Sequence, residues 1–213
     1  MATEVKRDLI VALRATLVTL VLTGLVYPLV LTGVGQLVFS RKANGSLVRD
    51  EQGKVVGSEL IGQAFANPGY LQGRPSAAGN GYDATASSGS NLGPTSKKLR
   101  DRVVADIARL RRENPDAPLP VPADLVTASA SGLDPDLSPG AALWQVARIA
   151  RARQVTPDRI AEVIGTRVEG RDLGVFGEPR VNVLAVNMAL DAQFGKPASL
   201  PAPAGTTSPS AAK

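Results

Sequence analysis

The sequence predicts an α+β protein in which one N-terminal transmembrane helix precedes a small domain of mixed helices and strands. Three observations lead to this prediction. An apolar run covers residues 9–31, an alternating segment between Gly45 and Gly57 indicates a β-hairpin, and capped helical patterns follow residue 95. We divide the chain into an N-terminal segment 1–8, a transmembrane helix with its extension 9–39, a soluble domain 40–195 and a disordered tail 196–213.

The apolar run from Leu9 to Leu31 contains one charged residue, Arg14. As a helix it would be about 34 Å long, enough to cross a hydrocarbon layer of roughly 30 Å. A cleaved signal peptide would have a shorter apolar stretch and a small-residue cleavage site, so we favour a retained span. Tyr27 and Pro28 are predicted contacts with another membrane subunit. Basic residues flank both ends of the run, so the positive-inside rule does not determine its orientation.

The region after the span alternates short structured segments with a long polar loop. Ser46–Arg49 and Lys54–Val56 are predicted strands of a hairpin. Residues 67–95 are rich in Gly, Ser, Asn, Pro and Ala, and loops of this length in a compact domain are usually functional or disordered.

Capping signals place the helices. Ser96 or Thr95 is predicted to cap a helix that Asn114-Pro115 ends, and its basic run is interpreted as a solvated face. Ser138-Pro139 and Thr156-Pro157 begin two further helices. Residues 121–128 are predicted as a short strand, and residues 181–194 as a buried helix closing at Gly195, whose first residues could instead form a strand.

The composition excludes several kinds of chemistry. The chain has no histidine and no cysteine, which rules out a Ser-His-Asp triad, a thiol nucleophile and a zinc ribbon. The net charge of +5 is spread along the chain and aromatic residues make up only 4%, so we expect no nucleic-acid binding. No phosphate-binding GxxxxGK[ST] loop is present. Asp134 and Asp136 could hold a cation, but an Asx-type turn is the favoured interpretation.

Six segments, in order and at natural spacing, resemble the C subunits of Kdp-type potassium-transporting ATPases, the KdpC family, and the resemblance runs from about residue 8 to residue 194. Val26 to Leu29 of the span also fits. Leu71 and Asp136 depart from the pattern, because many members have an aromatic residue and a histidine there. The six segments are Gly57 to Phe65, Tyr70 to Ala77, Ser88 to Gly93, Thr127 to Pro135, Ala142 to Arg148 and Gly177 to Leu184.

The resemblance implies a non-catalytic accessory subunit of an ATP-driven potassium uptake complex in the bacterial inner membrane. It implies a cytoplasmic N-terminus and a domain outside the membrane. The implied partners are a potassium-binding channel-like subunit, a P-type ATPase subunit that holds the catalytic site, and a very small membrane subunit. Members are described as catalytic chaperones that raise the ATP affinity of the ATPase subunit. We expect no cofactor bound by this chain alone, and ATP only together with that subunit.

Two groups of loop residues are candidates for these roles. Ser88, Gly89, Ser90 and Asn91 could form an anion-binding nest, although a polar loop packed on a partner is the favoured interpretation. Arg74, Ser129, Ser131 and Asp134 are predicted partner contacts, because loops on a scaffold often carry function. The alternative function from a different class is a membrane-anchored periplasmic hydrolase, which would have to work without histidine or cysteine.

Overall fold

A computed structural model describes residues 1–50 and 52–198 of the 213-residue chain. The chain divides into two compact units, Met1–Val56 and Gly57–Lys213. Most of the tail predicted as disordered, residues 199–213, lies outside the described residues.

The first unit begins with an apolar helix. Its parts are α1 (Ala2–Val21), a wider π-helical turn (Leu22–Val26) and α2 (Tyr27–Val38), which follow one another without a break. The stretch Thr3–Val38 is long and apolar enough to cross a membrane, and its most apolar window is entirely exposed. The helix predicted over residues 9–39 is therefore confirmed as far as Val38, and it begins earlier than predicted, at Ala2.

A short helix and the predicted hairpin follow the apolar helix. The helix α3 (Ser40–Ala43) precedes β1 (Leu47–Arg49), which pairs with β2 (Val55–Ser58). The Asp50 carboxylate stabilises the turn, because its Oδ1 accepts hydrogen bonds from the backbone N–H of Gln52 at 3.0 Å and of Lys54 at 2.9 Å. The hairpin prediction is confirmed.

The second unit begins with the long loop. Residues 59–96, all of them described, contain no helix or strand. The helix α4 (Lys97–Glu113) follows, and the Ser96 hydroxyl caps it by accepting a hydrogen bond from Leu99 N at 3.4 Å. Asn114 ends α4, as predicted, and the basic residues Arg100, Arg111 and Arg112 lie exposed on its surface while Leu110 is buried.

The strand predicted over residues 121–128 is wrong. A single 3₁₀ turn, Ala123–Leu125, forms there instead. The Ala123 carbonyl accepts hydrogen bonds from Val126 N at 3.0 Å and Thr127 N at 2.9 Å. These local hydrogen bonds use backbone N–H and C=O groups that a β-strand would need for pairing with a neighbouring strand. Leu125 and Val126, which are adjacent in the chain, are both buried, whereas a strand would place them on opposite faces.

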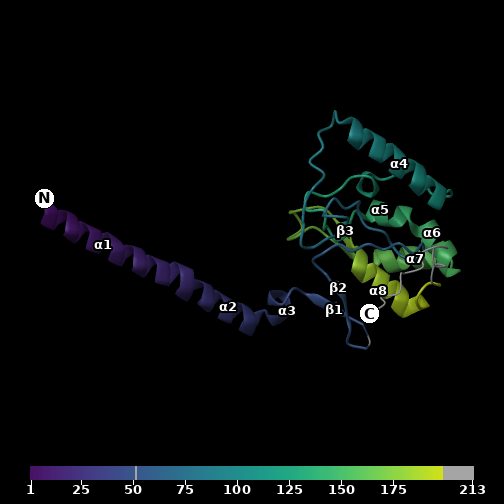
Figure 1. Ribbon diagram of the computed structural model, residues 1–213. Coiled ribbons are helices and arrows are strands. Elements are labelled where there is room, and N and C mark those ends of the chain that lie inside the picture. Colours follow the sequence, from purple (N-terminus) through teal and green to yellow (C-terminus); the bar gives the residue numbers. More distant parts are fainter. Residues whose placement is uncertain (51, 199–213) are drawn as a thin grey trace, which may run out of the picture. The chain divides into compact units, whose positions relative to one another are not determined.

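Further helices follow α4 in the described part of the domain (Figure 1). The predicted starts are confirmed: α5 is Pro139–Trp144, which Ser138 caps, and α7 is Pro157–Gly165, although Thr156 makes no side-chain cap bond. Gln145 interrupts the helix after α5, so α6 (Val146–Arg153) is a separate element. The last helix, α8 (Val183–Phe194), ends at Gly195, and α7 contacts α5, α6 and α8.

Three very short strands form an antiparallel sheet in the order β3-β5-β4. The central strand, β5 (Arg180–Asn182), leads directly into α8, which confirms the strand alternative for its first residues. Val181 pairs with Leu137 of β3 (Asp136–Leu137) on one side and with Val168 of β4 (Val168–Glu169) on the other.

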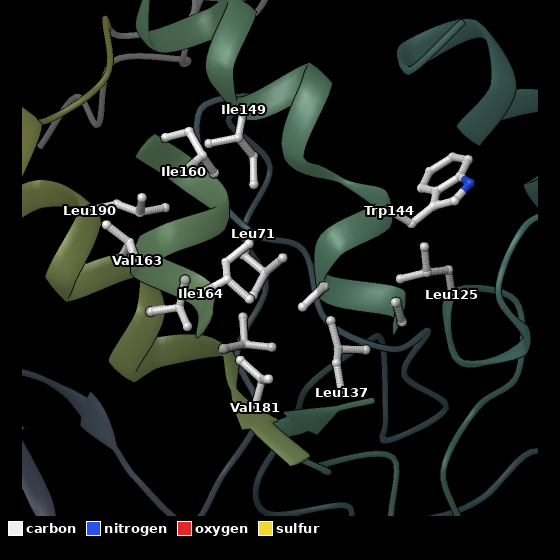
Figure 2. Packing of buried hydrophobic residues seen from close by; sticks show 14 of the residues in the cluster. Leu71, Leu125, Leu137, Trp144, Ile149, Ile160, Val163, Ile164, Val181 and Leu190 are labelled. Atoms are coloured by element: carbon white, nitrogen blue, oxygen red, sulfur yellow. The ribbon is translucent and has the colours of Figure 1, made fainter. Parts of the chain in front are cut away.

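The core gathers side chains from the loop, the sheet and the helices. Figure 2 shows Leu71, from the long loop, among Ile149 of α6, Ile164 of α7 and Val181 of β5. Leu71 is fully buried. The long loop is therefore part of the core and not a segment lying on the surface.

Candidate functional site

Two loops that are distant in sequence are joined along their length. Gly62 N donates to Leu133 O at 2.8 Å, and Ser88 N donates to Ser131 O at 2.9 Å. Between these points the Ser76 hydroxyl donates to Gly132 O at 2.6 Å. The segment 127–135 and the long loop therefore form one surface, called here the joined-loop surface.

Close backbone approach explains the glycines at these crossings. Gly132 has φ +68°, and a Cβ there would lie 2.5 Å from Ser88 O and 2.7 Å from Ala78 N. A Cβ on Gly62 would lie 2.6 Å from Asp134 O. Only glycine fits both positions without displacing backbone.

The structure places Arg74 and Asp134, two predicted contact residues, against each other. Arg74 Nη1 lies 3.1 Å from Asp134 Oδ2, with side chains 25% and 30% exposed. Arg74 also donates from Nε to Thr127 O and from Nη2 to Thr127 Oγ1, both at 3.3 Å. The main role visible for this arginine is therefore to connect the two loops.

The serines of the same segment lie nearer to solvent. The hydroxyls of Ser129 and Ser131 are 3.4 Å apart, and Ser131 Oγ accepts a hydrogen bond from Leu133 N at 3.1 Å. Ser131 is exposed and Ser129 is half-buried. These two serines thus lie at the surface beside the Arg74–Asp134 pair, and their contact role stays a prediction.

The stretch Ser88 to Asn91 lies on the same surface. One of its amides is already used, because Ser88 N donates to Ser131 O. The Ser88 hydroxyl donates to Gly89 O at 3.0 Å, and Asn91 has φ +48°. The anion-binding nest stays a prediction that would depend on the amides of Gly89, Ser90 and Asn91.

Asp136 and Asp134 adopt the predicted turn. Asp136 N donates to Asp134 Oδ1 at 3.1 Å, which is the expected Asx-type geometry. Burial, together with the nearby Asp134 charge, raises the pKa of Asp136, while a hydrogen bond from Asn182 and the Arg180 charge oppose the rise. Among the described residues, no group of three His, Cys, Asp or Glu side chains could hold a metal ion.

Tyr27 and Pro28 stand in the apolar helix of the first unit. The wide turn Leu22–Val26 immediately precedes them, and Tyr27 N donates to Leu22 O, five residues earlier. Pro28 has no N–H to donate to the helix. In the widened turn before it, the N–H of Tyr27 is paired with the carbonyl of Leu22. The Tyr27 side chain is 62% exposed, which leaves it accessible to another helix.

A cavity of about 390 Å³ opens between α4 and the long loop. Phe65, Tyr82 and Leu110 supply apolar walls, and Arg74 lies at its edge. Arg109 of α4 also lines it and pairs with Glu113 at 3.1 Å and Asp106 at 3.6 Å. Two arginines, Arg74 and Arg109, and two carboxylates, Asp106 and Glu113, line the cavity, so its formal charges balance. The cavity was not predicted from the sequence. The only signal there was the helical spacing of Asp106, Arg109 and Glu113, which predicts ion pairs on one face of α4 but no cavity.

A buried polar group holds the loop that carries Leu71. Arg148 is 4% exposed and donates to Pro68 O at 2.6 Å and to Tyr70 O at 3.1 Å. Gln145 pairs with Gln72, accepting from its N at 3.0 Å and donating to its O at 2.9 Å. The side chains of Arg148 and Gln145 thus supply the hydrogen bonds that a neighbouring strand would otherwise give to the backbone of residues 68–72. The sequence analysis assigned no role to Arg148, although the Trp144-Gln145-x-x-Arg148 spacing was the available signal.

A second arginine connects the same loop to the end of α8. Arg153 donates from Nε to Gly69 O and from Nη1 to Gly195 O, both at 2.6 Å, and pairs with Asp191 at 2.8 Å. The Tyr70 hydroxyl donates to the other Asp191 oxygen at 2.8 Å. Burial, with the hydrogen bond to Asp191 and its negative charge, raises the pKa of Tyr70 to about 12.

The fold defines a class of proteins with one helix of membrane-spanning length and a separate folded α+β domain. Residues 9–192 match the protein family described as KdpC, the c chain of the K⁺-transporting ATPase. The chain therefore belongs to the KdpC family, whose members are subunits of a potassium-transporting ATPase complex.

Relatives are similar in sequence to this chain over most of its length. The potassium-transporting ATPase KdpC subunit of Myxococcus xanthus is 62% identical over 199 residues, which cover 93% of this chain and 94% of the relative. The KdpC subunit of Caulobacter vibrioides is 55% identical, over 85% of this chain and 93% of the relative. That of Koribacter versatilis is 50% identical, over 87% and 95%.

Proposed function

We propose that this chain is a non-catalytic accessory subunit that an ATP-driven potassium uptake complex needs for assembly and activity. The observation that carries the proposal is the exposed apolar helix Thr3–Val38 in a chain of the KdpC family. Such a helix gains stability when lipid or another membrane helix covers it. The proposed partners are the potassium-binding channel-like subunit, the P-type ATPase subunit that carries the catalytic site, and a very small membrane subunit.

The proposed location is the bacterial inner membrane, with segment 1–8 in the cytoplasm and the domain outside. Support comes from the family resemblance, because the basic residues flanking the span do not favour one orientation. In this orientation the joined-loop surface, with Ser129 and Ser131, faces partner domains outside the membrane and not the cytosol.

The proposed effect on ATP affinity is indirect. A domain outside the membrane cannot meet cytosolic ATP, so its influence would pass through the membrane-embedded partners. A direct role of Ser88 to Asn91 would require the domain to be cytoplasmic and ATP to be bound together with the ATPase subunit. The membrane side of the domain therefore decides between the two mechanisms.

Two experiments test the proposal. A tagged full-length chain, expressed with the other subunits in detergent-stable form, is expected to co-purify with the channel-like and ATPase subunits. Deleting the chain is expected to abolish potassium-stimulated ATPase activity in membranes. Recovery of the tagged chain alone, with full ATPase activity after its deletion, would contradict the proposal.

A topology reporter tests the orientation. An alkaline phosphatase fusion at the C-terminus is active only outside the cytoplasm, whereas a fluorescent protein fusion folds efficiently inside. We expect an active phosphatase fusion. A fluorescent C-terminal fusion with inactive phosphatase would place the domain in the cytoplasm and favour direct contact with ATP.

A further inference from the structure

The loop between β4 and β5 exposes three apolar side chains at its tip. Leu173 is 90% exposed, Phe176 66% and Val175 70%. They lie in the short loop between Val168–Glu169 and Arg180–Asn182, where an antiparallel bridge joins Asp172 and Phe176. Exposed apolar residues are common singly, but a cluster of large ones at a loop tip marks an interaction site.

Backbone hydrogen bonds close the tip into a turn. Asp172 N donates to Phe176 O at 2.8 Å, and Phe176 N donates to Asp172 O at 2.9 Å. Leu173 has φ +54°, an unfavourable left-handed conformation for a residue with a large side chain. This closed turn displays the apolar side chains at little further entropic cost, which is how preorganised binding loops gain affinity.

Paired charges surround the tip. Arg171 pairs with Glu178 at 2.7 Å, and Arg180 pairs with Glu169 at 3.1 Å and Asp172 at 3.5 Å. Residues 167–180 contain three arginines and three carboxylates and so have no net charge. An apolar centre within a polar rim is the usual anatomy of a protein interface.

This charge pattern distinguishes between two occupants. Loops that insert into bacterial lipid usually have an excess of basic side chains that attract anionic headgroups. Here Arg171 and Arg180 are paired with carboxylates, and residues 167–180 have no net charge, so attraction to an anionic surface is weak. An exposed apolar tip with a neutral rim is complementary to an uncharged apolar pocket on another protein.

We infer that the tip formed by Leu173, Val175 and Phe176 inserts into an apolar pocket on another protein subunit of the potassium-transporting complex. The inference rests on the proposed function, because it takes the partner from the same assembly. It adds a defined docking element, remote in sequence from Arg74, Ser129, Ser131 and Asp134, to the surfaces that sequence analysis considered.

Photo-crosslinking tests the inference directly. The full chain carrying p-benzoyl-phenylalanine in place of Phe176 is expressed with the other subunits, irradiated and analysed by mass spectrometry. We expect a covalent adduct with another subunit. The same probe in place of Val104, which is 59% exposed on α4, is the control and is expected to give a much weaker adduct.

Serine substitutions measure the contribution of the tip. The double variant V175S/F176S is expected to lower the yield of co-purified partner subunits about 10-fold, the size of effect typical of truncated interface hot spots. Val104→Ser, at a site that is also more than half exposed, is expected to leave the yield unchanged. Equal thermal unfolding of the two variants and the wild type in detergent would show that folding is unaffected.

The outcomes separate this inference from the proposed function. If the wild-type chain co-purifies with its partners but the tip gives only lipid adducts, adducts within its own chain, or no more adduct than position 104, the inference is overturned and the proposed function stands. If the wild-type chain captures no transport subunit, the proposed function itself fails.

Discussion

The side chain of Asn187 pairs with both backbone groups of Leu71. Leu71 N donates to Asn187 Oδ1 at 2.7 Å, and Asn187 Nδ2 donates to Leu71 O at 2.9 Å. Both residues are buried, so one amide on α8 satisfies a loop residue that would otherwise need a neighbouring strand. This pairing lets the long loop contribute Leu71 to the middle of the core.

Replacing Asn187 with leucine is expected to destabilise the domain by about 3 kcal/mol, because two buried backbone groups would lose their partners. Urea unfolding of the full chain in detergent, followed by the fluorescence of Trp144, measures this change, since Trp144 is the single tryptophan. Gln193→Leu, at an exposed position of the same helix, is the control and is expected to change stability little. Equal effects of the two variants would contradict the role assigned to the pairing.

Gly132→Ala is expected to destabilise the domain by about 2 kcal/mol or more, because its Cβ would meet the backbone of Ser88 and Ala78. Gly140→Ala is the matched control. Gly140 lies in α5 with no atom within 4 Å of an added Cβ, so alanine there should be neutral or stabilise by about 0.5–1 kcal/mol. Thermal unfolding of both variants gives the comparison, and a well-tolerated Gly132→Ala would show that the two loops are not held together.

The Tyr70 hydroxyl is expected to ionise near pH 12, because burial and Asp191 raise its pKa to about 12. A raised pKa in the folded state means that the unfolded chain loses this proton first, near pH 10. The stability contributed by Tyr70 is therefore complete below pH 10 and is lost as the pH rises toward 12. Tyr70→Phe is expected to remove this pH-dependent part of the stability, because phenylalanine has no hydroxyl to ionise.

Ultraviolet difference titration of wild type against Tyr70→Phe isolates this tyrosine from the other two in the chain. Asp191→Asn is expected to lower the pKa of Tyr70 toward 10, since the hydrogen bond to a carboxylate and its charge are both removed. A difference titration centred at pH 10 in the wild type would disprove the Tyr70–Asp191 interaction.

The Arg74–Asp134 pair is expected to show a coupling energy of about 1 kcal/mol in the isolated chain, because the pair is partly buried and hydrogen-bonded. A double-mutant cycle with R74M, D134N and the double variant, measured by urea unfolding, gives this energy. The exposed pair Arg151–Asp116 is the control, for which we expect almost no coupling. No coupling between Arg74 and Asp134 would favour the original prediction that both side chains serve a partner instead of each other.

Local signals determined the helices well. The apolar run required a membrane-length helix, and Ser96, Ser138 and Asn114 marked helix ends, because capping depends on neighbouring residues alone. The hairpin at β1 and β2 was predictable for the same reason, since a short turn joins its strands. The family resemblance added the assignment to a potassium-transporting ATPase, which residue patterns alone did not reach.

Tertiary structure decided what depends on residues far apart in the chain. The strands β3, β4 and β5 have only two or three residues each, too few for a period, and exist because Val181 finds partners on both sides. Arg74 meets Asp134 across 60 positions, and Asn187 meets Leu71 across 116. The sequence by itself therefore determined the membrane-length helix and the helix ends, whereas only the folded chain decided that the long loop is a core element, because buried backbone groups must find partners wherever the fold supplies them.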